Sequence, residues 1–311
     1  MAAAACAGEV RIVRQGDRWT LLRDGQPYFV RGAVVIGGAG SEVLLDQLKA
    51  LGGNSARASA GMLDALDRRG LTGFIGLPIG KARQGFDYSD AGQASKLEAS
   101  IRVIVEKNKD HPALLLWTIG NEPNIGSTRE QARQSYQAIE RFARLVKSID
   151  PKHPVITVIG DGEMRQFLPD LNELCPSLDA LGLNAYHRVF FLRKEVAARG
   201  WTRPYLITEF GPRGHWQVGR SPWDMPVEDT STEKAAHYRA SYESVVQDNP
   251  QRLGSYVFLW YGKHQEDLRK DVADNPNVGG DREPPSAPLP GAFAEHRGAD
   301  ALQRVPAEAG A

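Results

Sequence analysis

Short apolar runs alternate with longer amphipathic runs through the middle of the chain. A strand that is buried on both faces reads as an almost continuous apolar stretch, whereas a helix on a sheet has apolar residues every three or four positions. The runs ALLLWTI and PVITVI are of the first kind. The pattern predicts eight strands, at residues 28–32, 54–57, 71–77, 113–119, 154–159, 180–184, 205–208 and 255–260.

Helical patterns lie between these predicted strands. The clearest covers residues 128–150, where apolar side chains recur on one stripe. Thr128 and Gln131 have the spacing of a capping box at its start, and Pro151 stops it at its end. Further helices are predicted at 42–51, 62–69, 96–108, 163–168, 191–198 and 230–246, with a short eighth helix near 265–272.

Eight strands with intervening helices over about 250 residues match a (β/α)8 TIM barrel in size. A doubly wound open sheet is the rival, and it is disfavoured because no GxGxxG or GxxxxGK[ST] loop follows any strand. Residues 9–27 are predicted to form a β-hairpin, with Asp24-Gly25 near a turn. The expected division is an N-terminal segment at 1–27, a barrel at 28–274, and a poorly ordered Pro/Ala-rich tail at 275–311.

Composition narrows the classes of partner. Of the 311 residues, 38 are Lys or Arg and 38 are Asp or Glu, so no basic surplus points to nucleic acid. No apolar run reaches the length of a membrane span and no clear signal peptide is present, so no membrane partner and, by default, a cytoplasmic location are expected. Cys6, Cys175 and the seven histidines show no metal-binding spacing. No metal and no cofactor are expected, and oligomeric state has no marker.

Chemistry in a TIM barrel lies at the carboxyl ends of the strands. Glu122 follows the fourth predicted strand and Glu209 follows the seventh. Two carboxyl groups on one rim suit glycosidic cleavage, where one must be protonated to help the leaving oxygen depart and the other must be ionised. The candidate substrate-binding residues at strand ends are Arg57, Asn121, Asn184, Tyr186 and Trp260, and those in loops over the same face are His187 and Trp216.

Opposite protonation states require different surroundings. Arg57 and the Tyr186 hydroxyl, placed near Glu209, are expected to keep that carboxylate charged. Glu122 is expected to hold its proton through a less polar environment and the repulsion of Glu209. Trp260 offers a stacking face for a sugar ring.

Several segments together resemble glycoside hydrolase clan A, and within it the family 2 barrel. They are GQPYFVRG (25–32), LGGNSAR (51–57), HPALLLWTIGNE (111–122), LNAY (183–186), PYLITEFG (204–211) and YVFLW (256–260).

The resemblance implies roles for the residues in those segments. It makes Glu122 the acid/base and Glu209 the nucleophile, with retention of anomeric configuration. It also implies that Asn121 holds the sugar 2-hydroxyl, that Arg57 and Tyr186 support the nucleophile, and that Trp260 floors the sugar site.

Three features depart from the family pattern. In this sequence only 27 residues precede the predicted barrel, where β-sandwich domains usually stand in the family. Ser59-Ala60 stand where the family often has a histidine, and the segment after Gln265 has no counterpart.

The expected function is therefore a retaining glycoside hydrolase that cleaves a β-linked glycoside, its carbohydrate substrate, by double displacement. Retention predicts carboxyl groups about 5–5.5 Å apart, against roughly 6.5–9.5 Å for inversion. The alternatives are a transglycosylase of the same fold and a non-catalytic carbohydrate-binding barrel.

Overall fold

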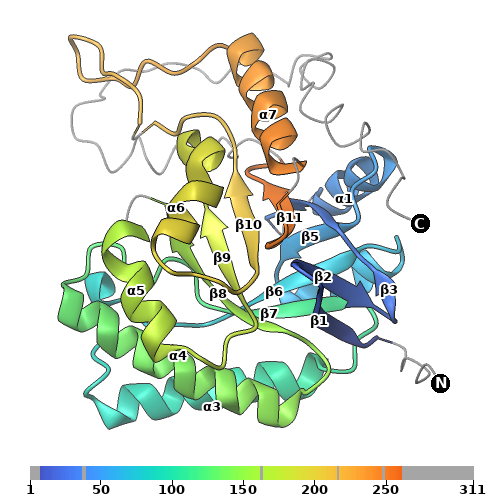
Figure 1. The fold of residues 1–311 in the computed structure, drawn as a ribbon, viewed down its shortest axis with the longest axis vertical. Coiled ribbons are helices and arrows are strands. Elements are labelled where there is room, and N and C mark those ends of the chain that lie inside the picture. Colours follow the sequence, from blue (N-terminus) through green and yellow to red (C-terminus); the bar gives the residue numbers. More distant parts are fainter. Residues whose placement is uncertain (1–7, 37–39, 162–163, 216, 247–248, 261–311) are drawn as a thin grey trace.

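The computed structural model describes residues 8–36, 40–161, 164–215, 217–246 and 249–260. Within them, eight parallel strands close into a barrel in the order β10-β11-β4-β5-β6-β7-β8-β9, with helices around it (Figure 1). The predicted TIM barrel is confirmed. The strands are β4 (Val30–Val34), β5 (Ser55–Ala58), β6 (Thr72–Leu77), β7 (Leu114–Ile119), β8 (Val155–Gly160), β9 (Ala180–Asn184), β10 (Tyr205–Phe210) and β11 (Arg252–Val257).

The helices follow the predicted order along the chain. They are α1 (Ser41–Ala50), α2 (Leu63–Asp67), α3 (Ala91–Asn108), α4 (Arg129–Ile149), α5 (Met164–Leu174), α6 (Leu192–Ala198) and α7 (Ser231–Val246), with short 3-10 turns η1 (Ala60–Met62), η2 (Ala82–Gln84) and η3 (His187–Phe191). Helix α4 begins with the predicted capping box, in which the Thr128 side chain accepts from the Gln131 backbone and the Gln131 side chain accepts from the Thr128 backbone. Local sequence alone therefore determines where this helix starts.

Helix α3, helix α5 and strand β11 differ most from the prediction. Helix α3 starts at Ala91, five residues early, because the Asp90 side chain accepts from the backbone of Gly92 and Gln93 and caps it. Helix α5 continues through Pro169 to Leu174. Proline removes a helical hydrogen bond, but α5 packs along α4 and buries apolar side chains there, and this packing offsets the loss.

Strand β11 occupies 252–257 instead of the predicted 255–260. Its position is set by pairing with both neighbours, through Tyr205 opposite Arg252 and Val30 opposite Gly254. The apolar letters that extend the run to Trp260 belong to the segment after the strand. The predicted helix near 265–272 and the tail at 275–311 lie outside the described residues.

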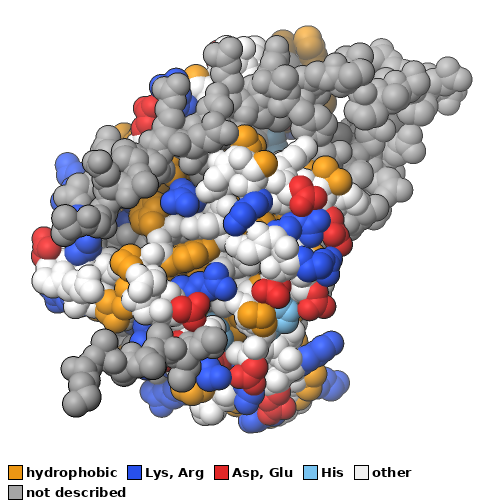
Figure 2. Space-filling model, turned by 90° about the vertical axis from the view of Figure 1, so that its right-hand side faces the viewer, with side chains coloured by type: hydrophobic (Ala, Val, Ile, Leu, Met, Phe, Trp, Pro, Cys, Tyr) orange, Lys and Arg blue, Asp and Glu red, His pale blue; other side chains and the backbone are white. Residues whose placement is uncertain are grey.

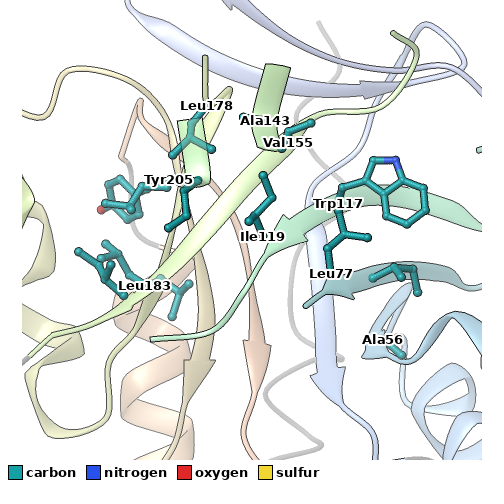
Figure 3. Close-up of a cluster of buried hydrophobic side chains, with 14 of the residues drawn as sticks. Ala56, Leu77, Trp117, Ile119, Ala143, Val155, Leu178, Leu183 and Tyr205 are labelled. Atoms are coloured by element: carbon teal, nitrogen blue, oxygen red, sulfur yellow. The ribbon is translucent and has the colours of Figure 1, made fainter. Parts of the chain in front are cut away.

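Apolar side chains form two layers. The inner cluster fills the barrel with side chains from the strands and the N-terminal sheet, including Phe74, Leu116 and Tyr256. The outer cluster lies between the strands and the helices, and Figure 3 shows part of it, including Trp117 and Leu77 from neighbouring strands. Strands β7 and β8 are buried along their whole length, and their sequences are apolar almost throughout.

A small antiparallel sheet covers the amino-terminal end of the barrel. It consists of β1 (Val10–Gln15), β2 (Arg18–Arg23) and β3 (Gln26–Pro27), so the predicted hairpin is present and a third strand extends it. Asp24-Gly25 forms the turn between β2 and β3, with φ of 52° and 77°. Backbone bonds from Val10 to Lys152 and from Trp19 to Pro250 tie the sheet to segments that lead into strands. The carboxyl ends of the strands lie at the other end.

The surface carries both signs of charge. On the face shown in Figure 2, basic and acidic side chains interleave, in keeping with the net charge of zero. In the described part of the chain, no helix is long and apolar enough to cross a bilayer. Within the same residues, no cluster of three or more His, Cys, Asp or Glu side chains is arranged to hold a metal ion.

A buried polar cluster joins the end of α4 to the barrel. Asp150 accepts 2.8 Å hydrogen bonds from the Trp117 indole and the His153 ring, and it is 1% exposed. Burial alone would raise the pKa of Asp150, but the bonds with His153 and Trp117 lower it.

We expect Asp150→Ala to destabilise the fold, because each buried donor left without an acceptor costs about 1–3 kcal/mol. Urea unfolding measures the change. Asp67→Ala, at an exposed helix position, is the control, and equal stability of the two variants would contradict the expectation.

Candidate active site

The predicted acidic residues lie at the carboxyl end of the barrel. Glu122 follows β7, and Glu209 is the penultimate residue of β10, which runs two residues beyond the predicted strand. Arg57 stands near the end of β5, and Asn184 is the last residue of β9, directly opposite Glu209 in the sheet. Tyr186 follows β9 by two residues. Because parallel strands in a closed barrel end on one rim, these residues gather there.

Both carboxylate oxygens of Glu209 accept a hydrogen bond. Arg57 Nη1 donates to Oε1 at 2.7 Å, and the Tyr186 hydroxyl donates to Oε2 at 2.5 Å. The side chains of Arg57 and Glu209 are 16% and 9% exposed, so little water competes for the ion pair. The Arg57 guanidinium lies over the ring of Phe74 at 5.3 Å, which fixes its position. The Glu209 carboxyl therefore has one defined orientation.

Burial and charge act in opposite directions on Glu209. Burial raises the pKa of Glu209, Arg57 and Tyr186 act to lower it, and the charge of Glu122 raises it further. Arg57 and Tyr186 thus oppose the protonation of Glu209, as expected, but the effect of burial is larger. Burial and the neighbouring Glu209 also raise the pKa of Tyr186, which stays a hydroxyl and donates its proton.

Glu122 is held by its backbone and by one amide. Its φ is 49°, in the left-handed region, and its N–H donates to the carbonyl of Val158 at 2.9 Å. Its Oε1 accepts from Asn184 Nδ2 at 2.9 Å. A Cβ on Gly160 would lie 3.1 Å from Oε1, so glycine at the end of β8 leaves room for the carboxyl.

Asn184 links the Glu122 carboxyl to the strand that bears Glu209. Its amide nitrogen also donates to Asn121 Oδ1 at 3.1 Å, and its oxygen accepts from the Thr208 hydroxyl at 2.8 Å. Thr208 directly precedes Glu209 in β10. A continuous chain of hydrogen bonds therefore runs from the strand of Glu209 to the side chain of Glu122.

Trp260, a predicted site residue, makes its described contacts elsewhere. The Trp260 indole donates to the carbonyl of Leu44 in α1 at 3.1 Å, and its ring packs against the outer cluster between strands and helices. The reason is that β11 ends at Val257, so Trp260 no longer occupies a strand end. Trp216 and the side chain of His187 lie outside the described residues.

Phe258 is an aromatic neighbour of the site that the sequence did not single out. Its ring meets that of Tyr186 edge to face, with 5.7 Å between centroids, and it belongs to the inner cluster. Phe258 is the first residue after β11, so the rule of reading strand ends would have found it had the strand been placed correctly.

Lys81 is a second residue that the prediction missed. It lies in the loop after β6, half-buried, and its charge interacts with those of Glu122 and Glu209. Burial lowers the pKa of Lys81, Arg83 lowers it further, and the two carboxylates act to raise it. Lys81 is therefore a second cation, besides Arg57, whose charge interacts with the acidic pair.

Comparison with known proteins identifies the family. Residues 81–274 match the model of the family described as glycosyl hydrolases family 2, TIM barrel domain. The chain belongs to glycosyl hydrolase family 2. The matched segment contains both Glu122 and Glu209, together with the strands from β7 onward.

The chain is similar in sequence to several known glycosidases. A β-glucuronidase of Streptococcus agalactiae is 26% identical over 251 residues, covering 69% of this chain and 39% of the relative. A probable mannan endo-1,4-β-mannosidase F of Aspergillus flavus is 23% identical over 155 residues, covering 42% of this chain and 33% of the relative. The chain thus spans less than half of the length of these relatives.

A solved structure shares the fold. The structure of Bifidobacterium dentium β-glucuronidase complexed with coumarin-3-O-glucuronide superposes with a TM-score of 0.60 at 18% identity, covering 80% of this chain and 43% of that one. At this identity the likeness concerns the fold.

The balance at Glu209 can be tested by titration. In Arg57→Gln we expect the pKa of Glu209 to rise further, because burial remains while the positive charge paired with the carboxylate is lost. Carbon-13 NMR of the Glu209 carboxyl, assigned with Glu209→Gln, measures the change. Arg57→Lys keeps a cation and should move the pKa less. An unchanged pKa in Arg57→Gln would show that the ion pair does not stabilise the carboxylate.

Proposed function

We propose that this family 2 barrel is a retaining glycosidase that cleaves β-linked glycosides by double displacement. The observation that carries the proposal is that both oxygens of Glu209 accept hydrogen bonds from Arg57 and Tyr186, beside a second carboxyl group, Glu122, at the same end of the barrel. A carboxylate held in this way is oriented to attack. Binding alone would not require a buried acidic side chain with two donors.

The proposed reaction has two steps. In the first, a Glu209 oxygen attacks the anomeric carbon, the bond to the leaving oxygen breaks, and Glu122 gives that oxygen its proton. The product is a glycosyl ester of Glu209. In the second step, Glu122 takes a proton from water, the water oxygen attacks the anomeric carbon, and the ester bond to Glu209 breaks. Glu122 ends protonated and Glu209 ends ionised, as they began.

The neighbouring residues support these steps. Arg57 and Tyr186 stabilise the charge of Glu209 before attack and again when it departs. The raised pKa of Glu209 makes it a stronger nucleophile once ionised, and a positively charged sugar in the transition state favours that ionised form. Asn121 uses its oxygen to accept from Asn184, which leaves its amide nitrogen to donate to the hydroxyl beside the reacting carbon.

The proposed substrate class rests on the feature that the names of the similar glycosidases share. Their names specify a glucuronide, a mannan and, in a Lactococcus lactis relative, a galactoside, so the sugar differs among them. The β-configuration is common to all three names. We therefore propose a β-linked carbohydrate substrate for this chain and name no particular sugar.

Rescue by azide tests the two roles separately. With an aryl β-glycoside that the wild type hydrolyses, Glu122→Ala should lower turnover by about 10²–10⁴-fold, and azide should restore it with a β-glycosyl azide as product. Glu209→Ala should lose turnover, and azide should give the α-glycosyl azide, because azide then attacks the sugar directly. Glu106→Ala, at an exposed position of α3, is the control. Reversed products would exchange the two roles.

The stereochemical course tests the mechanism itself. Proton NMR of the first sugar released from an aryl β-glycoside should show the β-anomer before mutarotation. A crystal structure should place the carboxyl groups of Glu122 and Glu209 about 5–5.5 Å apart. Initial release of the α-anomer would overturn double displacement.

A further inference from the structure

Asn184 is a buried amide with every polar atom of its side chain engaged. It is 1% exposed, so protein groups alone satisfy it. Its oxygen accepts one proton, from Thr208, and its two amide protons go to Asn121 and to Oε1 of Glu122. The amide nitrogen has two protons to donate and cannot accept, so these two hydrogen bonds use its full capacity.

Only one orientation of this amide satisfies its neighbours. If the amide were rotated by 180°, its oxygen would face the side-chain oxygens of Asn121 and Glu122, and both contacts would be repulsive. In the observed orientation the Asn184 oxygen needs a donor in a place that water does not reach, and the Thr208 hydroxyl supplies it. Thr208 is itself fully buried. The hydroxyl therefore stabilises the orientation that aims the amide at Glu122.

The amide bond distinguishes the two oxygens of Glu122. An oxygen that accepts a hydrogen bond is less basic than one that does not, so Oε1 is the poorer site for a proton. Gly160 lies on the same side: a Cβ at this position would come within 3.1 Å of Oε1, so glycine leaves room for Oε1 to reach the Asn184 amide. The Asn184 donor therefore engages Oε1 and leaves Oε2 for proton transfer.

We infer that Asn184, oriented by Thr208, determines which oxygen of Glu122 carries the transferable proton, and that Thr208 is a positioning residue for the acid/base. The inference rests on the proposed function, in which Glu122 protonates the leaving oxygen. In the first step the proton passes from Oε2 to that oxygen as the glycosidic bond breaks, and Oε1 keeps its bond from Asn184. Thr208 precedes Glu209, so one strand bears both the nucleophile and the support of the acid/base.

Leaving-group dependence tests the inference. Thr208→Val keeps the size of the side chain and removes the hydroxyl, whereas Thr208→Ser keeps the hydroxyl. For kcat/KM we compare phenyl β-glycosides, which need protonation, with 2,4-dinitrophenyl β-glycosides, which do not. The ratio of phenyl to dinitrophenyl rates should fall roughly tenfold in Thr208→Val, the effect of about one hydrogen bond to a charged group. Thr208→Ser should restore the wild-type ratio.

The pH profile supplies a second readout. A hydrogen bond to a carboxylate favours its charged form, so weakening the Asn184 bond should favour the protonated form of Glu122. Because Glu122 must be protonated in the first step, the alkaline limb of kcat/KM should move to higher pH in Thr208→Val. Asn184→Ala removes the amide altogether. It should lower the ratio of phenyl to dinitrophenyl rates further and move the alkaline limb of kcat/KM to still higher pH.

The outcomes separate the two hypotheses. Equal slowing of both substrates in Thr208→Val, with an unmoved alkaline limb, would reduce Thr208 to a structural role and overturn the inference while the proposed function stood. An unchanged ratio in folded Asn184→Ala, verified by circular dichroism, would overturn it as well. A wild type that hydrolyses none of the aryl β-glucosides, galactosides, mannosides or glucuronides, or a Glu209→Gln variant with full turnover, would instead overturn the proposed function.

Discussion

The closure of parallel strands into a barrel is the constraint on which the site depends. It brings together Arg57 and Glu209, which are 152 positions apart in the chain and 2.7 Å apart in the structure. Every strand runs in the same direction, so every carboxyl end contributes to one rim. The N-terminal sheet occupies the opposite end, where it extends the inner core with Val10 and Leu21. The sheet that extends the core and the rim that holds the acidic pair therefore lie at opposite ends of the barrel.

Within this rim the two acidic residues have different surroundings. Glu209 lies in a strand, buried, with a cation and a hydroxyl on its oxygens. Glu122 lies after a strand, in a left-handed backbone conformation, with an amide on one oxygen. The difference arises from their positions in the chain. Glu209 lies within a strand and has neighbouring strands on both sides. Glu122 lies in the segment after β7, and its side chain reaches Asn184 at the end of β9. Lys81 adds a positive charge near both, which moderates their mutual repulsion.

The family of this chain and the roles of its individual residues rest on different evidence. Membership in family 2 rests on the matched sequence, and the TIM barrel is seen directly in the strand order. The roles of individual residues rest on their contacts instead, because similar folds support many reactions. Asn184 illustrates the difference, since its sequence position suggested contact with substrate, whereas its contacts are with Glu122, Asn121 and Thr208.

The sequence by itself determined the order of strands and helices, the start of α4 at its capping box, and the presence of acidic residues after two strands, because these depend on local periodicity and on nearby polar groups. Tertiary structure decided where β11 ends, and with it that Phe258 and not Trp260 faces Tyr186. It also decided that burial raises the pKa of Glu209 despite Arg57. Strand register and desolvation both arise from segments distant in the chain, and no local pattern encodes them.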